Sequence, residues 1–257
     1  MKKTQLLGLV AAAVLSTPTF AVTYGSSGGS TLQGVLDGIT QTTPSNPTGM
    51  SSIDVTTDYL NDSSDTYWAI NGSGGAVNTI IVELAGFKDD TTFGIYDATT
   101  DQHVEIFDGA ASAGDLNKTL SILLDGSVLI GGVDTGKDFS TNRFNFYLDS
   151  TAGNIDGYQG GLFYSDTSLN ADGVDHMTAF QGQGDTVQID PYAPGIWGAN
   201  EYILAWEDLY GGGDADYSDF VVMVESISPV PAPATLALMG IGLLGLVGTS
   251  RRRKTKA

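Results

Sequence analysis

The sequence predicts an all-β protein, an antiparallel β-sandwich or jelly-roll-like domain. From residue 77 onward, short runs of β-branched and aromatic residues are bounded by Asp, Gly and Asn. These turn residues recur about every ten positions, a spacing typical of sandwiches and jelly rolls. Phe144, Phe146 and Leu148 occupy alternate positions in one run, so one face of that strand is expected to be buried. The 34 glycines suit the tight turns and bulges of such a fold.

The region 22–75 precedes these runs and is rich in Ser, Thr, Gly and Asn. Leu32, Val35 and Leu36 follow the i, i+3, i+4 spacing of an amphipathic helix, which predicts a short helix over 31–40. We expect this region to form a cap on the β domain.

The expected strands follow in order. They lie at 78–87, 91–98, 102–109, 118–126, 127–133, 143–150, 160–167, 176–182, 185–191, 201–209 and 219–227. One sandwich formed from all of them is the preferred organisation. Two small β units that divide near Lys137 are the alternative.

The N-terminal segment 1–21 has the features of a secretory signal peptide. Lys2 and Lys3 are followed by an apolar run at 6–15 that is too short to span a bilayer. Thr19 and Ala21 supply small residues at the two positions that a signal peptidase reads, and cleavage is expected after Ala21. The chain is therefore expected to be exported and processed by signal peptidase.

The C-terminal end carries a second apolar segment. Residues 230–248 contain nineteen positions without charge, close to the ~20 that span membrane hydrocarbon. A basic cluster, Arg251 to Lys254, follows directly, and the positive-inside rule keeps these cations in the cytoplasm. By itself this pattern predicts a transmembrane helix that anchors an exported chain.

The order of a proline motif, an apolar helix and an arginine cluster resembles the PEP-CTERM sorting signal of Gram-negative bacteria. Here the motif is Val230-Pro231-Ala232-Pro233, with alanine where glutamate is usual. The resemblance covers 229–257 and implies recognition by an exosortase, transient residence in the inner membrane and cleavage near the prolines. It implies a final location in the cell envelope, at the cell surface or outside the cell.

Removing both ends leaves about 22–229, which holds all 30 acidic residues and only four basic ones, a formal charge of −26. Such a surface repels nucleic acid and anionic lipid and attracts cations. The chain has no cysteine, which excludes disulfides and thiolate metal sites. Enough residues remain at 76–228 for one sandwich domain with its own core.

The sequence does not indicate an enzyme. Its two histidines, His103 and His176, lie at expected strand ends, where we expect surface positions. They belong to no nucleophile elbow or zinc-binding helix motif. A hydrolase using two carboxylates is the least favoured hypothesis, because 30 acidic residues allow no particular pair to be selected.

The clearest candidate for a functional site is the acidic segment EDLYGGGDADYSDF at 207–220. Calcium binds six to eight hard oxygen ligands, such as carboxylates and carbonyls. The segment offers five carboxylates as metal ligands, namely Glu207, Asp208, Asp214, Asp216 and Asp219, with the Ser218 hydroxyl as a further oxygen. A true EF-hand is excluded, because Asp219 stands where its glycine is required and a strand follows. A calcium site between two strands and an ordinary acidic turn remain the alternatives.

The stretch ILAWEDLYGGGDADYSDFVVMVE resembles the domain of unknown function 4114 family, with its signature at about 140–226. Upstream stretches resemble PEP-CTERM proteins that carry this domain, so the wider similarity covers about 75–228. The resemblance implies a secreted β domain whose distinguishing feature is the acidic loop, and it implies no reaction.

Together these features favour an exported, non-enzymatic envelope or extracellular-matrix protein whose cofactor is calcium. Sorting by exosortase links it to biofilm by analogy, with exopolysaccharide as a candidate partner. The alternative is a carbohydrate-binding module that stacks sugars on Trp68, Trp197 or Trp206. Of these, Trp197 is the residue expected to be exposed.

Overall fold

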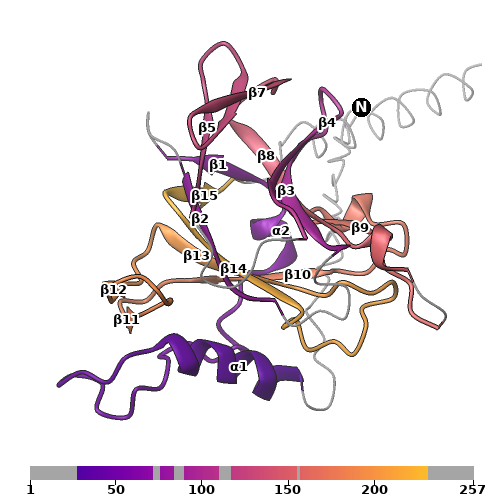
Figure 1. Cartoon of the computed structure of the whole chain (residues 1–257). Coiled ribbons are helices and arrows are strands. Elements are labelled where there is room, and N and C mark those ends of the chain that lie inside the picture. The colour runs from indigo at the N-terminus through magenta and orange to yellow at the C-terminus, as the bar shows by residue number, and fades with distance from the viewer. Residues whose placement is uncertain (1–27, 72–75, 84–89, 110–116, 155–156, 231–257) are drawn as a thin grey trace, which may run out of the picture.

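The structure is a computed structural model that describes residues 28–71, 76–83, 90–109, 117–154 and 157–230 (Figure 1). The signal peptide predicted at 1–21 and the segment from 231 to the end, with its predicted membrane helix, lie outside the described residues. Among the helices that are described, none has the length and apolar character needed to cross a membrane.

Strands dominate the described part of the chain. The helices are α1 (Gly28–Ile39) and α2 (Asp62–Asp65), with short 3-10 turns η2 (Thr151–Gly153) and η3 (Thr167–Leu169). The strands are β1 (Trp68–Ile70), β2 (Ala76–Glu83), β3 (Thr92–Asp97), β4 (Gln102–Phe107), β5 (Lys118–Ile122), β6 (Ser127–Ile130), β7 (Val133–Asp138), β8 (Arg143–Asp149), β9 (Leu162–Tyr164), β10 (Met177–Gln181), β11 (Thr186–Val187), β12 (Gly195–Ile196), β13 (Glu201–Trp206), β14 (Phe220–Glu225) and β15 (Ile227–Pro229).

The strands form two large sheets and one small ribbon. The first sheet has the order β15-β1-β8-β3-β4, with β9 also paired to β8, and the second has the order β10-β13-β14-β2-β5-β6-β7. The ribbon consists of β11 and β12. Neighbouring strands run antiparallel in every register that the structure defines. The prediction of an all-β chain with antiparallel sheets is confirmed.

The two large sheets share one apolar core. The ring of Phe93 on β3 lies 6.2 Å from Trp206 on β13 and 5.2 Å from Phe220 on β14, measured between centroids. Buried residues that precede and follow Lys137, such as Val128 and Phe144, belong to the same cluster. Two sheets that bury their inner faces against each other give the layer arrangement of a sandwich.

Helix α1 covers the outer face of the second sheet (Figure 1). Its buried Leu32 and Leu36 belong to a second core with Ile203 on β13 and Met223 on β14. Because these central strands are buried on both faces, their sequences read as continuous apolar runs and do not alternate with polar residues. The helix predicted over 31–40 is present and begins at Gly28.

All three tryptophans are buried, so the expectation that Trp197 is exposed was wrong. Trp197 packs in the second core, and its indole Nε1 donates to the backbone oxygen of Glu201 at 3.1 Å. Trp68 and Trp206 lie in the core between the sheets. Their relative exposure is 0% in each case, which leaves no tryptophan surface for stacking sugars.

Phe93 is at the centre of the sandwich core, and we expect its replacement by alanine to be severely destabilising. It contacts Phe107, Phe146, Trp206 and Phe220. The variant Phe93→Ala should lower the free energy of unfolding by about 3–5 kcal/mol, because a cavity remains in a packed interior. Urea unfolding followed by tryptophan fluorescence measures the change.

The control for this measurement is Leu124→Ala. Leu124 lies fully exposed in the turn between β5 and β6. Its truncation should change the free energy of unfolding by no more than about 0.5 kcal/mol. Equal effects of the two substitutions would contradict the assignment of the core.

Candidate functional site

The candidate site is the loop that joins β13 to β14. These strands pair along their full length, and Trp206 at the end of β13 faces Phe220 at the start of β14. The carboxylates of the intervening segment are therefore confined to a loop whose two ends are fixed side by side. Both strands are buried on two faces, which gives this loop a rigid base.

The loop turns sharply through its glycines. Gly211, Gly212 and Gly213 have φ angles of 82°, 83° and 49°, which glycine adopts at little cost. A Cβ atom at Gly213 would collide with Glu207 Oε2, so glycine also lets the backbone approach this carboxylate. Ala215 and Tyr217 have φ angles of 56° and 53°, uncommon for residues with a side chain. The surrounding structure therefore imposes the loop conformation.

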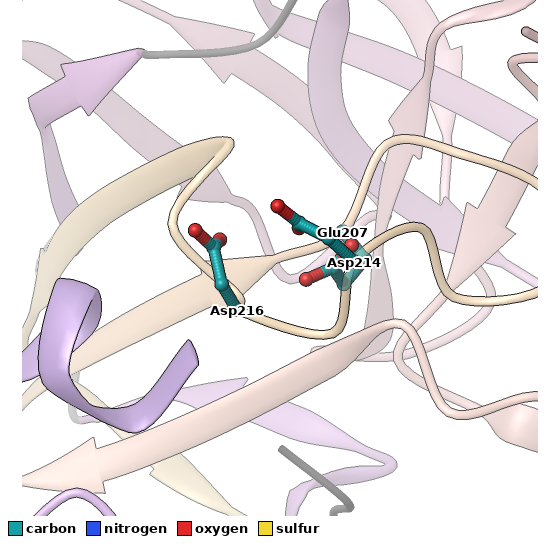
Figure 2. Close-up of side chains that lie close together, drawn as sticks. All are labelled: Glu207, Asp214 and Asp216. Carbon is teal, nitrogen blue, oxygen red and sulfur yellow. The ribbon is translucent and has the colours of Figure 1, made fainter. Parts of the chain in front are cut away.

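Three carboxylates converge in this loop, those of Glu207, Asp214 and Asp216 (Figure 2). One oxygen atom of each lies within 4.8 Å of the others. Glu207 is fully buried, Asp216 is half-buried and Asp214 is exposed, so the group opens to solvent on one side. This spacing allows one cation to contact all three side chains.

Glu207 is the central member of the group. Its Oε1 accepts a hydrogen bond from the Tyr217 backbone N–H at 2.6 Å, whereas its buried Oε2 has no partner in the described structure. Burial raises the pKa of Glu207 to about 8, and the charges of Asp214 and Asp216 act in the same direction. A buried carboxylate oxygen without a donor is costly unless a proton or a cation neutralises it.

Ser218 positions Asp216 within the group. Both its backbone N–H and its hydroxyl donate to Asp216 Oδ1, each at 2.7 Å. The hydroxyl that the sequence offered as a further metal ligand is thus buried against a carboxylate, where it orients Asp216. The other oxygen of Asp216 is not involved in these bonds.

Asp208 and Asp219, the two other predicted ligands, lie outside this group and contact each other. The Asp208 backbone N–H donates to Asp219 Oδ2 at 3.2 Å. Burial raises the pKa of Asp219 to about 9, and the neighbouring charges of Asp208 and Glu207 add to the effect. Side chains of consecutive residues in extended chain point in opposite directions, which separates Asp208 from Glu207. The structure therefore divides the five predicted ligands into a group of three and a pair.

A buried histidine, His176, packs against the backbone of the loop. The rings of His176 and Phe163 stack at 3.6 Å, and His176 Nδ1 lies 3.2 Å from the Glu207 backbone oxygen. Its Nε2 lies 2.9 Å from Asp172 Oδ2, which also accepts from the Gly211 backbone N–H at 2.8 Å. The surface position expected for His176 was wrong, because its relative exposure is 0%. Nothing in the linear pattern distinguished Asp172 and His176 from other strand-end residues.

The raised pKa values predict that stability falls with rising pH when no metal is present. Glu207 and Asp219 have ordinary values of 4.5 and 3.8, so the folded chain holds their protons at pH values where the unfolded chain has lost them. The contribution of these two protonated groups to the free energy of unfolding is complete below pH ~4. It is lost as the pH rises through ~8–9. Urea unfolding in EDTA, repeated between about pH 5 and 9, measures this dependence.

The variant Glu207→Gln should flatten this pH dependence, because the amide does not titrate. The control is Glu105→Gln, which removes one exposed carboxylate from β4. This control should leave the slope of unfolding free energy against pH close to that of the wild type. If Glu207→Gln leaves the slope of unfolding free energy against pH unchanged, Glu207 is ionised in the folded chain throughout the pH range measured.

Comparison with known families identifies two parts of the chain. Residues 139–226 match the Domain of unknown function (DUF4114), about a third of the chain, and residues 229–254 match the PEP-CTERM protein-sorting motif. No curated protein matches the sequence. The first match spans β8 to β14 and includes the acidic loop, while β1 to β7 precede it, so both sheets extend beyond the matched region. The chain therefore carries a DUF4114 region followed directly by a PEP-CTERM sorting motif, as its sequence predicted.

Proposed function

We propose that this chain is an exported, non-enzymatic protein of the cell envelope or extracellular matrix, in which calcium stabilises the loop between its last two long strands. The sorting motif implies export and processing by exosortase. The observation that carries the calcium assignment is the fully buried Glu207, whose unpartnered Oε2 belongs to the group with Asp214 and Asp216. A role in biofilm, with exopolysaccharide as the partner, rests on the sorting motif alone.

Calcium fits the donors of this group better than other common metal ions do. Glu207, Asp214 and Asp216 supply only carboxylate oxygens, the hard ligands that calcium and magnesium prefer over the nitrogen and sulfur ligands of zinc or copper. Magnesium requires near-ideal octahedral geometry, whereas calcium accepts irregular sets of six to eight oxygens. Loop carbonyls and water would complete the set on the side where Asp214 is exposed.

The bound ion would act by joining distant parts of the loop. Glu207 follows β13, whereas Asp214 and Asp216 lie beyond the glycine turn, so one cation would hold the turn against the strand end. It would also remove the repulsion among three carboxylates, none of which forms an ion pair with a basic side chain in the described part of the chain. The extracellular side of a membrane is rich in calcium, which suits extracellular modules with dissociation constants near the millimolar range.

The packing of the histidines supports the non-enzymatic part of the proposal. His176 is enclosed between Phe163 and the loop backbone, and His103 stacks on Tyr96 with its Nε2 near the Tyr164 hydroxyl. A general base must reach the proton it abstracts. The contacts of both rings within the fold favour structural roles.

Calcium should raise the melting temperature of the full chain, studied in detergent. At a concentration about 100 times the dissociation constant, binding contributes about 2.7 kcal/mol, equivalent to roughly 5–10 °C for a domain of this size. Magnesium should give a smaller shift. Differential scanning calorimetry in EDTA, magnesium and calcium measures the difference.

The paired variant Asp214→Asn with Asp216→Asn should remove most of this calcium response, since it takes away two anionic ligands and keeps their shape. The matched control is Asp134→Asn with Asp138→Asn, which removes the same charge from the exposed strand β7. The control should respond as the wild type does. Equal responses from both variants would reduce the calcium effect to screening of the overall negative charge and would contradict the site.

Processing can be tested in a Gram-negative host that contains an exosortase. We expect mass spectrometry of the mature protein to find its C-terminus near 230–233, with the peptide containing Arg251 absent. Ala232→Glu, which restores the usual residue of the proline motif, should leave the cut in the same place. Recovery of mature protein that still carries 251–254 would show a permanent anchor.

A further inference from the structure

A cavity of about 400 Å³ lies between the β11–β12 ribbon and the second sheet. Its charged residues come from the sheet, Glu201 at the start of β13 and Glu225 at the end of β14. The acidic loop joins the opposite ends of these two strands, at Trp206 and Phe220, so the cavity is separate from the candidate calcium site. A cavity of this volume is large enough for a small organic molecule.

Aliphatic side chains form much of the cavity wall. Ile189 lies in the loop that connects the two strands of the ribbon, Ile196 lies on β12, and Met223 lies on β14. Ile196 is 62% exposed, so the apolar wall reaches the surface of the molecule. The hydroxyl of Tyr192 accepts a hydrogen bond from the Asn117 backbone N–H at 3.0 Å, which ties the ribbon loop to the chain just before β5.

The two carboxylates of the cavity face each other across an antiparallel strand pair. Glu201 is the direct partner of Glu225 in the register of β13 and β14, a position where like charges destabilise a sheet. Both side chains are half-buried, and Glu201 Oε2 accepts from the Gly198 backbone N–H at 2.6 Å. Burial raises the pKa of Glu225, and the charge of Glu201 acts in the same direction. A ligand that brings positive charge would relieve this repulsion.

The described part of the chain supplies no counter-charge to this pair. Neither carboxylate forms an ion pair with a described basic side chain. Lys118 follows Asn117 of the cavity, but it lies two residues before Leu120, which belongs to the core between the sheets. Because alternate residues of a strand share one face, Lys118 lies on the face of the sheet opposite to the cavity.

We propose that this cavity binds a primary ammonium group carried on a short aliphatic chain. An ammonium has three N–H donors, so it would bond Glu201 and Glu225 at the same time. The methylene groups of the ligand would lie along Ile189, Ile196 and Met223 and would be removed from water there. A metal ion would leave this aliphatic wall uncovered, whereas a neutral alcohol would leave the repulsion between the carboxylates in place.

Two kinds of molecule carry such a group. One is a free aliphatic diamine, and the other is a polypeptide whose lysine side chain enters the cavity. The formal charge of −26 on residues 22–229 attracts both of them. The ligand chemistry is the same in the two cases, and the experiment distinguishes the sources.

The test is the binding of 1,5-diaminopentane to the full chain in detergent, measured by isothermal titration calorimetry at about 150 mM salt with excess calcium. Salt at this concentration screens the general attraction of a cation to an acidic surface, and calcium competes for the acidic loop. We expect saturable binding of one diamine per chain. We expect none of 1,5-pentanediol, which has the same length and no charge.

A blocked lysine, Nα-acetyl-lysine methylamide, identifies the source of the ammonium group. Affinity equal to that of the diamine indicates a lysine side chain, and affinity at least ten-fold weaker indicates a free amine. If neither compound binds, or if the diol binds as well as the diamine, the proposal is wrong.

The paired variant Glu201→Gln with Glu225→Gln should weaken diamine binding at least about ten-fold, because each amide keeps the shape of the side chain and loses its charge. The matched control is Asp134→Asn with Asp138→Asn, which removes the same charge from the exposed strand β7. This control should bind the diamine as the wild type does. Equal affinities of the paired variant and the control would overturn the assignment to the cavity.

A substitution on the apolar wall covers the case in which the paired variant does not fold. Ile196→Ser changes an exposed side chain and keeps every charge, so the fold should tolerate it. It should weaken diamine binding about four-fold, because the methylene chain loses an apolar contact. Unchanged affinity in a folded Ile196→Ser chain, confirmed by circular dichroism, would also contradict the proposal.

Discussion

The pairing of β13 with β14 is the constraint on which the rest of the structure depends. These strands contribute Tyr202, Leu204 and Trp206 to the core between the sheets, and Ile203 and Ala205 to the core beneath α1. The same pairing holds the two ends of the acidic loop together. Glu207 must therefore lie at the end of a buried strand, where its carboxylate is removed from water. The energy gained by burying both faces of these strands is what makes this costly position sustainable.

The large excess of acidic residues also limits where carboxylates can lie in the fold. With 30 acidic residues in about 22–229 and only four basic ones, most carboxylates must remain in water, and turns and exposed strands such as β7 provide that setting. The buried exceptions include Glu207 in the loop after β13, Asp97 at the end of β3 and Asp175 before β10. Tyr217 connects the loop to the segment before β10, because its backbone N–H donates to Glu207 Oε1 and its hydroxyl donates to the Asp175 backbone oxygen at 2.9 Å. The group of Glu207, Asp214 and Asp216 would lose its internal repulsion by binding a cation, which suits an exported protein.

Much of the fold could be predicted from local pattern, and the exceptions have physical causes. Leu32, Val35 and Leu36 located α1, and the apolar runs located β3, β4, β8, β13 and β14, because buried faces impose a period on the sequence. Strand β7 has almost no buried side chain, so no period marks it. Trp197 was misplaced because its neighbours Pro194, Gly195 and Gly198 are turn residues. Its burial depends on a core formed with α1, far away in the sequence.

The sequence by itself determined the PEP-CTERM sorting motif, the antiparallel β class and the acidic segment with its five carboxylates, since each is a property of contiguous residues. Only the tertiary structure decided which carboxylates converge. It placed Glu207 with Asp214 and Asp216, and it turned Asp208 toward Asp219. It also brought the Thr167 hydroxyl to the Asp62 carboxylate, more than a hundred residues away along the chain. The reason is that burial and proximity are set by how sheets pack, and the distance between two side chains across a packed junction is not encoded in their spacing along the chain.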